Sequence, residues 1–260
     1  MTAAMPLPSL AAEELTVERD GNVVLDNVSF SAGPGCLMGV VGPNGAGKST
    51  LFNVIVSLLP ATSGRVLVHG KSIQETRDLV AYVPQHERVN WRLPMSAWDV
   101  VLLGRTRRIG WFRRPGKADR AAAGDALEKV GLWDRRDSLV TELSGGQRQR
   151  VFVARALAQG ADVLLLDEAF SGVDIASQES LVSVLMQLRD EGRTILLSSH
   201  DINHLSHYCD ECLCLNCHVC ACGAPKEVLT AELLAELYGP FGGVPGHGHG
   251  LAGDEHGNHR

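Results

Sequence analysis

A nine-residue segment near the start of the chain carries the residue types and spacing suited to phosphate chemistry. Gly42 is followed after four residues by Gly47, Lys48 and Ser49, the pattern of a phosphate-binding loop. Its glycines let backbone N–H groups turn towards a phosphate, and the N-terminus of a following helix adds positive potential. An apolar run at 37–41 precedes the segment and helical spacing follows it, as this pattern requires. We therefore predict nucleotide contacts from Gly42, Pro43, Asn44, Gly45, Ala46, Gly47, Lys48, Ser49 and Thr50.

Two acids complete a hydrolytic set. Asp167 and Glu168 directly follow the apolar run at 163–166, which predicts a buried strand ending in carboxylates. Taken alone, they could simply mark the end of a strand. Beside a phosphate loop, Asp167 and the Ser49 hydroxyl are expected to hold Mg²⁺, while Lys48 neutralises the β- and γ-phosphates. Glu168 is then the candidate to orient and deprotonate the attacking water.

A second segment, residues 144–147, carries small and polar residues at the start of a predicted helix at 147–158. Small residues at a helix N-terminus make a seat for an anion. With Gln85, Asp174 and His200 in order along the chain, the two segments resemble the ATP-binding subunit of an ABC transporter over about residues 10–238. The resemblance implies that Ser144, Gly145, Gly146 and Gln147 contact the γ-phosphate of an ATP held by a second copy, so that two ATPs join a head-to-tail homodimer.

The same resemblance assigns the remaining site residues. Gln85 senses Mg²⁺ and the γ-phosphate where the helical subdomain joins the core, His200 contacts the γ-phosphate, and Asp174 lies across the dimer interface. Two residues depart from the family pattern. Arg19 stands where an aromatic side chain usually stacks on adenine; a guanidinium can stack on a base, but this puts adenine affinity in question. Ala169 replaces a proline after the catalytic glutamate, which removes rigidity and no reacting group.

The implied fold class is α/β: a P-loop NTPase core with a mostly parallel sheet, an N-terminal antiparallel hairpin region and an inserted helical subdomain. The hairpin is predicted at 15–30 around a turn at 20–22, and strand–helix–strand alternation after residue 163 indicates a parallel sheet. We expect a lead at 1–9, core segments at about 10–88 and 162–226, and a helical subdomain at about 89–161. A closing helix at about 227–238 and a Gly/His-rich tail at 239–260 complete the prediction.

Composition and charge limit the partners. The 260 residues carry a formal net charge of −6, whereas a nucleic-acid surface is usually basic, so no nucleic-acid partner is expected. The chain shows neither a signal peptide nor an apolar run long enough to span a bilayer. The resemblance therefore places it at the cytoplasmic face of the cell membrane, bound to integral permease subunits and acting indirectly with an extracytoplasmic metal-binding protein.

Three segments, residues 90–94, 99–105 and 111–115, together with 167–174, resemble the zinc, manganese and iron importers of the family. Apolar residues after Gln85 are expected to help form the groove that receives a permease helix. Alternatively, Trp91, Trp98 and Trp111 are ordinary core residues of the helical subdomain. An importer subunit for another small substrate, a soluble ABC-type ATPase without a transport role and a metal-storage protein remain as alternatives.

Cysteines and histidines leave further alternatives open. Six of the seven cysteines lie between residues 209 and 222, and the pairs Cys209/Cys212 and Cys217/Cys220 have zinc-like spacing. The same residues also fit two strands of a hairpin that turns at 216–217, in which cysteine acts as a small apolar residue. We favour this second interpretation. The tail histidines 247, 249, 256 and 259 could bind metal or belong to a solubilising tail.

Overall fold

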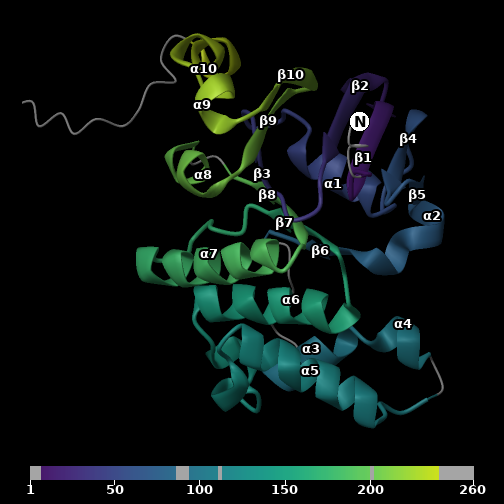
Figure 1. Cartoon of the computed structure of the whole chain (residues 1–260), viewed down its shortest axis with the longest axis vertical. Coiled ribbons are helices and arrows are strands. Elements are labelled where there is room, and N and C mark those ends of the chain that lie inside the picture. The colour runs from purple at the N-terminus through teal and green to yellow at the C-terminus, as the bar shows by residue number, and fades with distance from the viewer. Residues whose placement is uncertain (1–6, 86–93, 111–112, 200–201, 240–260) are drawn as a thin grey trace, which may run out of the picture.

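Residues 7–85, 94–110, 113–199 and 202–239 are described by the computed structural model (Figure 1). They form two sheets with helices around them. The larger sheet has the order β10-β9-β3-β8-β7-β6, and the smaller has the order β2-β1-β4-β5. The strands of the larger sheet are β3 (Leu37–Val41), β6 (Val80–Val83), β7 (Val163–Asp167), β8 (Thr194–Ser198), β9 (Glu211–Asn216) and β10 (His218–Gly223). Those of the smaller are β1 (Leu10–Arg19), β2 (Asn22–Ala32), β4 (Ser63–Val68) and β5 (Lys71–Ser72).

The larger sheet is parallel except at one edge, where β10 pairs antiparallel with β9. The smaller sheet is antiparallel throughout. This confirms the predicted α/β fold with a mostly parallel sheet and an N-terminal antiparallel hairpin. The hairpin strands reach beyond the predicted 15–30, because Leu10 pairs with both Ala32 and Val68.

The rest of the described chain consists of helices, short 3₁₀ turns and connecting loops. The α-helices are α1 (Lys48–Ile55), α2 (Ile73–Thr76), α3 (Ala97–Leu103), α4 (Thr106–Ile109), α5 (Lys117–Lys129), α6 (Gly145–Gln159), α7 (Ile175–Asp190), α8 (Ile202–Tyr208), α9 (Pro225–Val228) and α10 (Ala231–Tyr238). The 3₁₀ turns are η1 (Arg77–Leu79), η3 (Trp133–Arg135) and η4 (Val140–Glu142). Among the helices described, none combines the length and apolarity needed to cross a bilayer.

Strand β3 divides the core into two layers. Side chains alternate between the faces of a strand, so Leu37 and Val41 join one buried cluster while Met38 and Val40 join the other. The first cluster contains residues of α3 and α5–α7, and the second contains α1 and the smaller sheet. Figure 1 shows α3, α5, α6 and α7 stacked on one side of the molecule, with β1, β2 and β4 on the other. Both faces of the parallel sheet are thus covered.

Two predicted helices differ from the observed ones. The helix expected at 48–59 ends at Ile55, because Ser57 takes a left-handed φ of 57° and the backbone N–H of Leu58 turns back to the Asn53 carbonyl. The single closing helix expected at 227–238 is two helices, α9 and α10. The Thr230 side chain accepts a hydrogen bond from the Leu233 N–H and so caps a new start.

Between residues 94 and 162 the described chain consists of helices, 3₁₀ turns and connecting loops, and its β-structure is limited to one isolated bridge, Ser96 to Leu139. Helix α3 begins with a capping box in which Ser96 and Asp99 exchange hydrogen bonds. Trp98 packs edge-on against Trp133 with ring centroids 6.3 Å apart and borders the helical core. For Trp98 the structure favours the core interpretation, whereas Trp91 and Trp111 lie outside the described residues.

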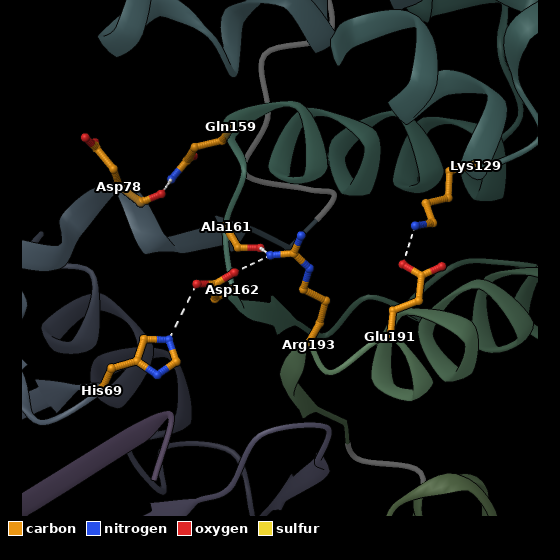
Figure 2. A network of polar contacts seen from close by, with 8 residues as sticks. All are labelled: His69, Asp78, Lys129, Gln159, Ala161, Asp162, Glu191 and Arg193. Atoms are coloured by element: carbon orange, nitrogen blue, oxygen red, sulfur yellow. Dashed lines mark hydrogen bonds and ion pairs between the residues drawn. The ribbon is translucent and has the colours of Figure 1, made fainter. Parts of the chain in front are cut away.

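A polar network joins the helical segment to the two sheets (Figure 2). Gln159, at the end of α6, donates hydrogen bonds to the carbonyls of Asp78 and Val80. Arg193 donates to the Ala161 carbonyl and pairs with Asp162, which also lies 3.5 Å from His69. A further pair, Lys129 with Glu191, connects α5 to the residue after α7. These contacts lie where β7 and β8 begin, at the opposite ends of those strands from Asp167 and Ser198.

Candidate active site

The phosphate loop connects β3 to α1, as predicted, and Lys48 is the first residue of that helix. Its side chain is buried, and Nζ donates to the carbonyl oxygens of Gly42 at 2.5 Å and Pro43 at 3.0 Å. Burial lowers the pKa of Lys48, and the negative charges of Glu168 and Asp167 oppose that shift. The carbonyl groups of the loop therefore hold the Lys48 ammonium group in place. The carboxylates of Glu168 and Asp167 are close enough to stabilise its positive charge.

Glycines are required at two points of the loop because other chain segments lie against it. A Cβ atom on Gly42 would lie 2.1 Å from the Leu215 carbonyl oxygen of β9. Gly47 has a φ of 96°, and a Cβ there would lie 2.6 Å from the Leu25 side chain in β2. Contacts under 3 Å exceed what packing can absorb, so the loop is closely held between β2 and β9.

A pocket of about 340 Å³ opens in front of the loop. Its lining consists of Val24, Asn44, Gly45, Ala46, Gly47, Lys48, Ser49, Thr50, Gln85 and Glu168. Gln85 Nε2 donates to Glu168 Oε2 at 2.8 Å across this pocket, although the two residues are 83 positions apart in sequence. The structure thus brings most of the predicted loop residues together with two predicted catalytic residues.

The end of β7 holds the two predicted acids in different environments. Asp167 is 1% exposed, and its carboxylate accepts hydrogen bonds from the Tyr82 hydroxyl at 3.0 Å and the Ser198 hydroxyl at 2.8 Å. Glu168 has a left-handed φ of 47°, and its N–H donates to the same Ser198 oxygen at 2.9 Å. Backbone of this kind in a non-glycine residue tends to occur at functional sites. One carboxylate is fixed beside the loop and the other faces the pocket.

Residues 144–147 and Asp174 form a separate cluster that does not line this pocket. Ser144 caps α6, and Gln147 closes a capping box with it. Asp174 caps α7 by accepting the Ser177 N–H at 3.0 Å. Hydrogen bonds from the Ser177 side chain and backbone lower the pKa of Asp174. The starts of α6 and α7 lie against each other, because a Cβ on Gly146 would come within 2.3 Å of the Ser177 Cβ.

Several predicted residues either lie outside the described part of the chain or do not line the pocket. His200 and the tail histidines lie outside the described residues. Arg19, at the exposed end of β1, is not among the residues that line the pocket. The N-terminal hairpin contributes Val24 of β2 to the lining instead. Asp167 lies behind the lining, as its burial indicates.

The β9–β10 hairpin contains five of the seven cysteines, as the favoured interpretation predicts: Cys212 and Cys214 in β9, Cys217 in the turn, and Cys220 and Cys222 in β10. All seven are free thiols; Cys212 and Cys214 are fully buried in β9, and burial raises the pKa of Cys214 to about 12. Within the described ranges, no group of three or more His, Cys, Asp or Glu residues could hold a metal ion. A protonated, buried thiol behaves as a small apolar side chain. Cys212 and Cys214 therefore have a packing role in β9.

Roles for Tyr82, Ser198 and Val24 do not follow from the motif pattern. Each contacts or borders the site through a neighbouring strand: Ser198 lies opposite Asp167 in the β7–β8 register. Polar residues at the ends of adjacent parallel strands meet at one sheet edge. The polar end of the strand at 194–198 was the sequence signal that could have identified Ser198.

Comparisons with known proteins agree with this geometry. The family model described as "ABC transporter" matches residues 25–171. The manganese transport system ATP-binding protein MntB of Halalkalibacterium halodurans is 42% identical over 231 residues, 89% of this chain and 92% of that protein. The zinc transport system ATP-binding protein TroB of Treponema pallidum is also 42% identical, over 89% and 87% of the two chains.

A solved structure supports the same assignment. A nucleotide-free ATP-binding cassette from an ABC transporter superposes with a TM-score of 0.80 at 26% identity, over 89% of this chain and 98% of that one. The phosphate loop, the paired acids, the fold and the relatives all point to the same family. The chain belongs to the ABC transporter family as an ATP-binding, ATP-hydrolysing subunit of a transport system.

Proposed function

We propose that the chain is the ATPase motor of a membrane importer for a divalent transition-metal ion, of the manganese, zinc and iron group. Relatives that match over nearly their whole length are named as manganese and zinc transport system ATP-binding proteins. The importer direction and the inclusion of iron rest on the resemblance of residues 90–94, 99–105, 111–115 and 167–174 to that branch. A soluble ABC-type ATPase without a transport role is not favoured by these relatives.

The observation that carries the proposed mechanism is the contact between Gln85 and Glu168 in front of the phosphate loop. Glu168 acts as general base: it accepts a proton from the water that attacks the γ-phosphate. Gln85 holds the Glu168 carboxylate by its 2.8 Å hydrogen bond and so orients it. Lys48 stabilises the negative charge that spreads over the γ-phosphate oxygens. His200 contributes a γ-phosphate contact from the segment after β8.

A magnesium ion fits the side chains at the end of the loop. Ser49 and Asp167 supply oxygen donors, with Gln85 as a third, and Mg²⁺ takes few protein ligands because it keeps water and substrate phosphates in its shell. Two hydroxyl donors, Tyr82 and Ser198, already fix the orientation of the Asp167 carboxylate. When bound, the ion would neutralise charge on the β- and γ-phosphates. Ser49 and Asp167 would hold it at the loop.

The cluster of Ser144, Gly145, Gly146, Gln147 and Asp174 serves a second copy of the chain. These residues stand apart from the pocket of their own chain, which supports a role at a head-to-tail homodimer interface. There the start of α6 would face the γ-phosphate bound by the partner subunit. ATP closes this dimer and hydrolysis reopens it, so the motion drives the permease.

The complex places the chain at the cytoplasmic face of the cell membrane. It binds integral permease subunits, which receive the ion from an extracytoplasmic metal-binding protein. Among the described residues, a shallow groove whose lining includes Met95, Leu102, Leu103 and Ile109 offers an apolar surface to a permease helix.

The decisive experiment uses the whole transporter with the variant Glu168→Gln. We expect ATP to bind and the ATPase subunits to remain dimeric, while kcat falls by about 10²–10⁴, the range for loss of a general base. Glu75→Gln, on the exposed side of α2, is the matched control and keeps wild-type turnover. Wild-type turnover in Glu168→Gln would contradict the role of the base, and a monomeric ATP-bound subunit would contradict the dimer.

Cargo is tested separately in vesicles that contain the complete transporter. Uptake of Mn²⁺, Zn²⁺ and Fe²⁺ is measured with ATP inside the cytoplasmic compartment, and the Glu168→Gln transporter serves as the background. We expect ATP-dependent uptake of at least one of these ions. Failure of all three ions, with intact ATPase activity, would overturn the metal assignment and leave the motor assignment standing.

A further inference from the structure

The turn between β9 and β10 lies directly against the phosphate loop. The Cys217 N–H, in that turn, donates a hydrogen bond to the Ala46 carbonyl at 3.0 Å. The Cys217 carbonyl accepts the Asp26 N–H of β2 at 2.7 Å. Figure 1 shows β10 and β2 side by side, and the two strands contact each other. One residue thus connects the middle of the loop to the N-terminal hairpin.

The same turn supports the start of the loop. The Leu215 carbonyl occupies the space that a side chain at Gly42 would need, at 2.1 Å from its Cβ position. Residues 215–217, here called the loop support, therefore contact the loop at Gly42 and at Ala46. Both contacts involve backbone atoms, which hold position better than long side chains do.

Cys217 reaches both partners because of its backbone conformation. Its φ is 60°, in the left-handed region that non-glycine residues seldom adopt. This conformation directs the N–H towards Ala46 while the carbonyl faces Asp26. A return to extended backbone would rotate these two groups and break at least one of the hydrogen bonds.

We propose that Cys217 is a positioning residue for the phosphate loop, and that ATP affinity depends on its left-handed backbone and not on its thiol. The proposal rests on the assigned role of the loop in binding ATP. In this arrangement the loop support pre-organises the N–H groups that receive the phosphates, so a disturbed support weakens ATP binding before it affects the chemical step.

A graded series of substitutions at position 217 separates backbone from side chain. Glycine and asparagine adopt the left-handed region readily, alanine less so, and β-branched valine least. The variants are Cys217→Gly, Cys217→Asn, Cys217→Ala and Cys217→Val. Cys222→Val, exposed in β10, is the matched control for adding valine to this hairpin. ATP dissociation constants, KM and kcat are measured on the full-length chain in complex with its permease, with Tm as a check of folding.

We expect Cys217→Gly, Cys217→Asn and Cys222→Val to bind ATP within about twofold of the wild type. Cys217→Val should bind about tenfold more weakly, with Cys217→Ala between them and kcat at saturating ATP little changed. If Cys217→Val does not fold, the ATP affinities of the glycine, asparagine and alanine variants test the proposal, with alanine expected to bind most weakly.

Equal affinities throughout the series, or equal losses in all four variants, would overturn the proposal, because affinity would then not follow the backbone. A loss confined to kcat would also overturn it. Failure of the wild-type complex to bind ATP would instead refute the proposed function of the loop, so the two failures are distinguishable.

Discussion

Gly146 is predicted from sequence as part of a phosphate seat, yet its surroundings give it a packing role that can be tested by substitution. A Cβ at this position would lie 2.3 Å from the Ser177 Cβ and 2.8 Å from its Oγ. Both positions are in the first turns of packed helices, α6 and α7, so neither backbone can move without shifting its helix. Gly146→Ala should therefore destabilise the chain.

The magnitude follows from two opposing terms. Overpacking of this kind costs about 1–3 kcal/mol, and alanine regains up to about 1 kcal/mol over glycine in a helix. We expect a net loss of about 1–2 kcal/mol, which lowers Tm by about 2–8 °C for a chain of this size. Thermal and urea unfolding of the purified chain measure the change.

Two partner substitutions make the test specific. Ser177→Gly removes the Cβ that Gly146→Ala would contact, whereas Ser177→Ala retains it; both remove the same hydroxyl. In a double-mutant cycle, Ser177→Gly should recover about 1 kcal/mol or more of the loss and Ser177→Ala should not. Equal interaction energies in the two cycles, after the effects of the single variants are subtracted, would refute the packing argument. Lost ATPase activity that persists after stability is recovered would show that Gly146 also acts at the dimer site.

Three further results are expected. Asp174→Ala should lower Tm at neutral pH, and the difference in Tm between variant and wild type should shrink as pH falls. The pKa of Asp174 is lower in the folded chain than in the unfolded chain. The ionised side chain therefore stabilises the fold above the unfolded-state pKa, and this stabilisation is lost as pH falls through the folded-state pKa. Its contribution is read from Tm between pH 7 and pH 3, and a gap that does not narrow would contradict the ionised cap. Purified protein with Cys217→Ser and Cys220→Ser should contain as much bound zinc as the wild type by elemental analysis, since neither thiol belongs to a group of three or more potential metal ligands among the described residues; a stoichiometric loss would restore the metal interpretation. Gln85→Ala should lower kcat more than it raises KM in steady-state ATPase assays, because it removes the hydrogen bond to Glu168 and leaves the phosphate loop intact; an effect on KM alone would argue against that role.

Local sequence was sufficient for elements whose signals are local. The phosphate loop, its flanking strand and helix, and the strand that ends in Asp167 each occupy a few consecutive residues, so spacing and polarity predict them. The predicted helix boundaries were wrong at two places. At Ser57 a left-handed backbone conformation ends the first helix early, and at Thr230 a side-chain cap begins a new helix. The boundaries of the helical subdomain remain a prediction.

What the sequence by itself determined is the chemistry: a loop for phosphate, carboxylates for water and metal, and a second motif in the family order. The tertiary structure decided how these parts meet. Gln85 reaches Glu168 across 83 residues, and Ser198 joins both acids from the next strand. Cys217 supports the loop from the turn that follows the neighbouring strand β9, through backbone atoms that every residue type shares. Such contacts depend on strand order and register, and no local pattern of side chains encodes which distant backbone groups will lie within hydrogen-bonding distance.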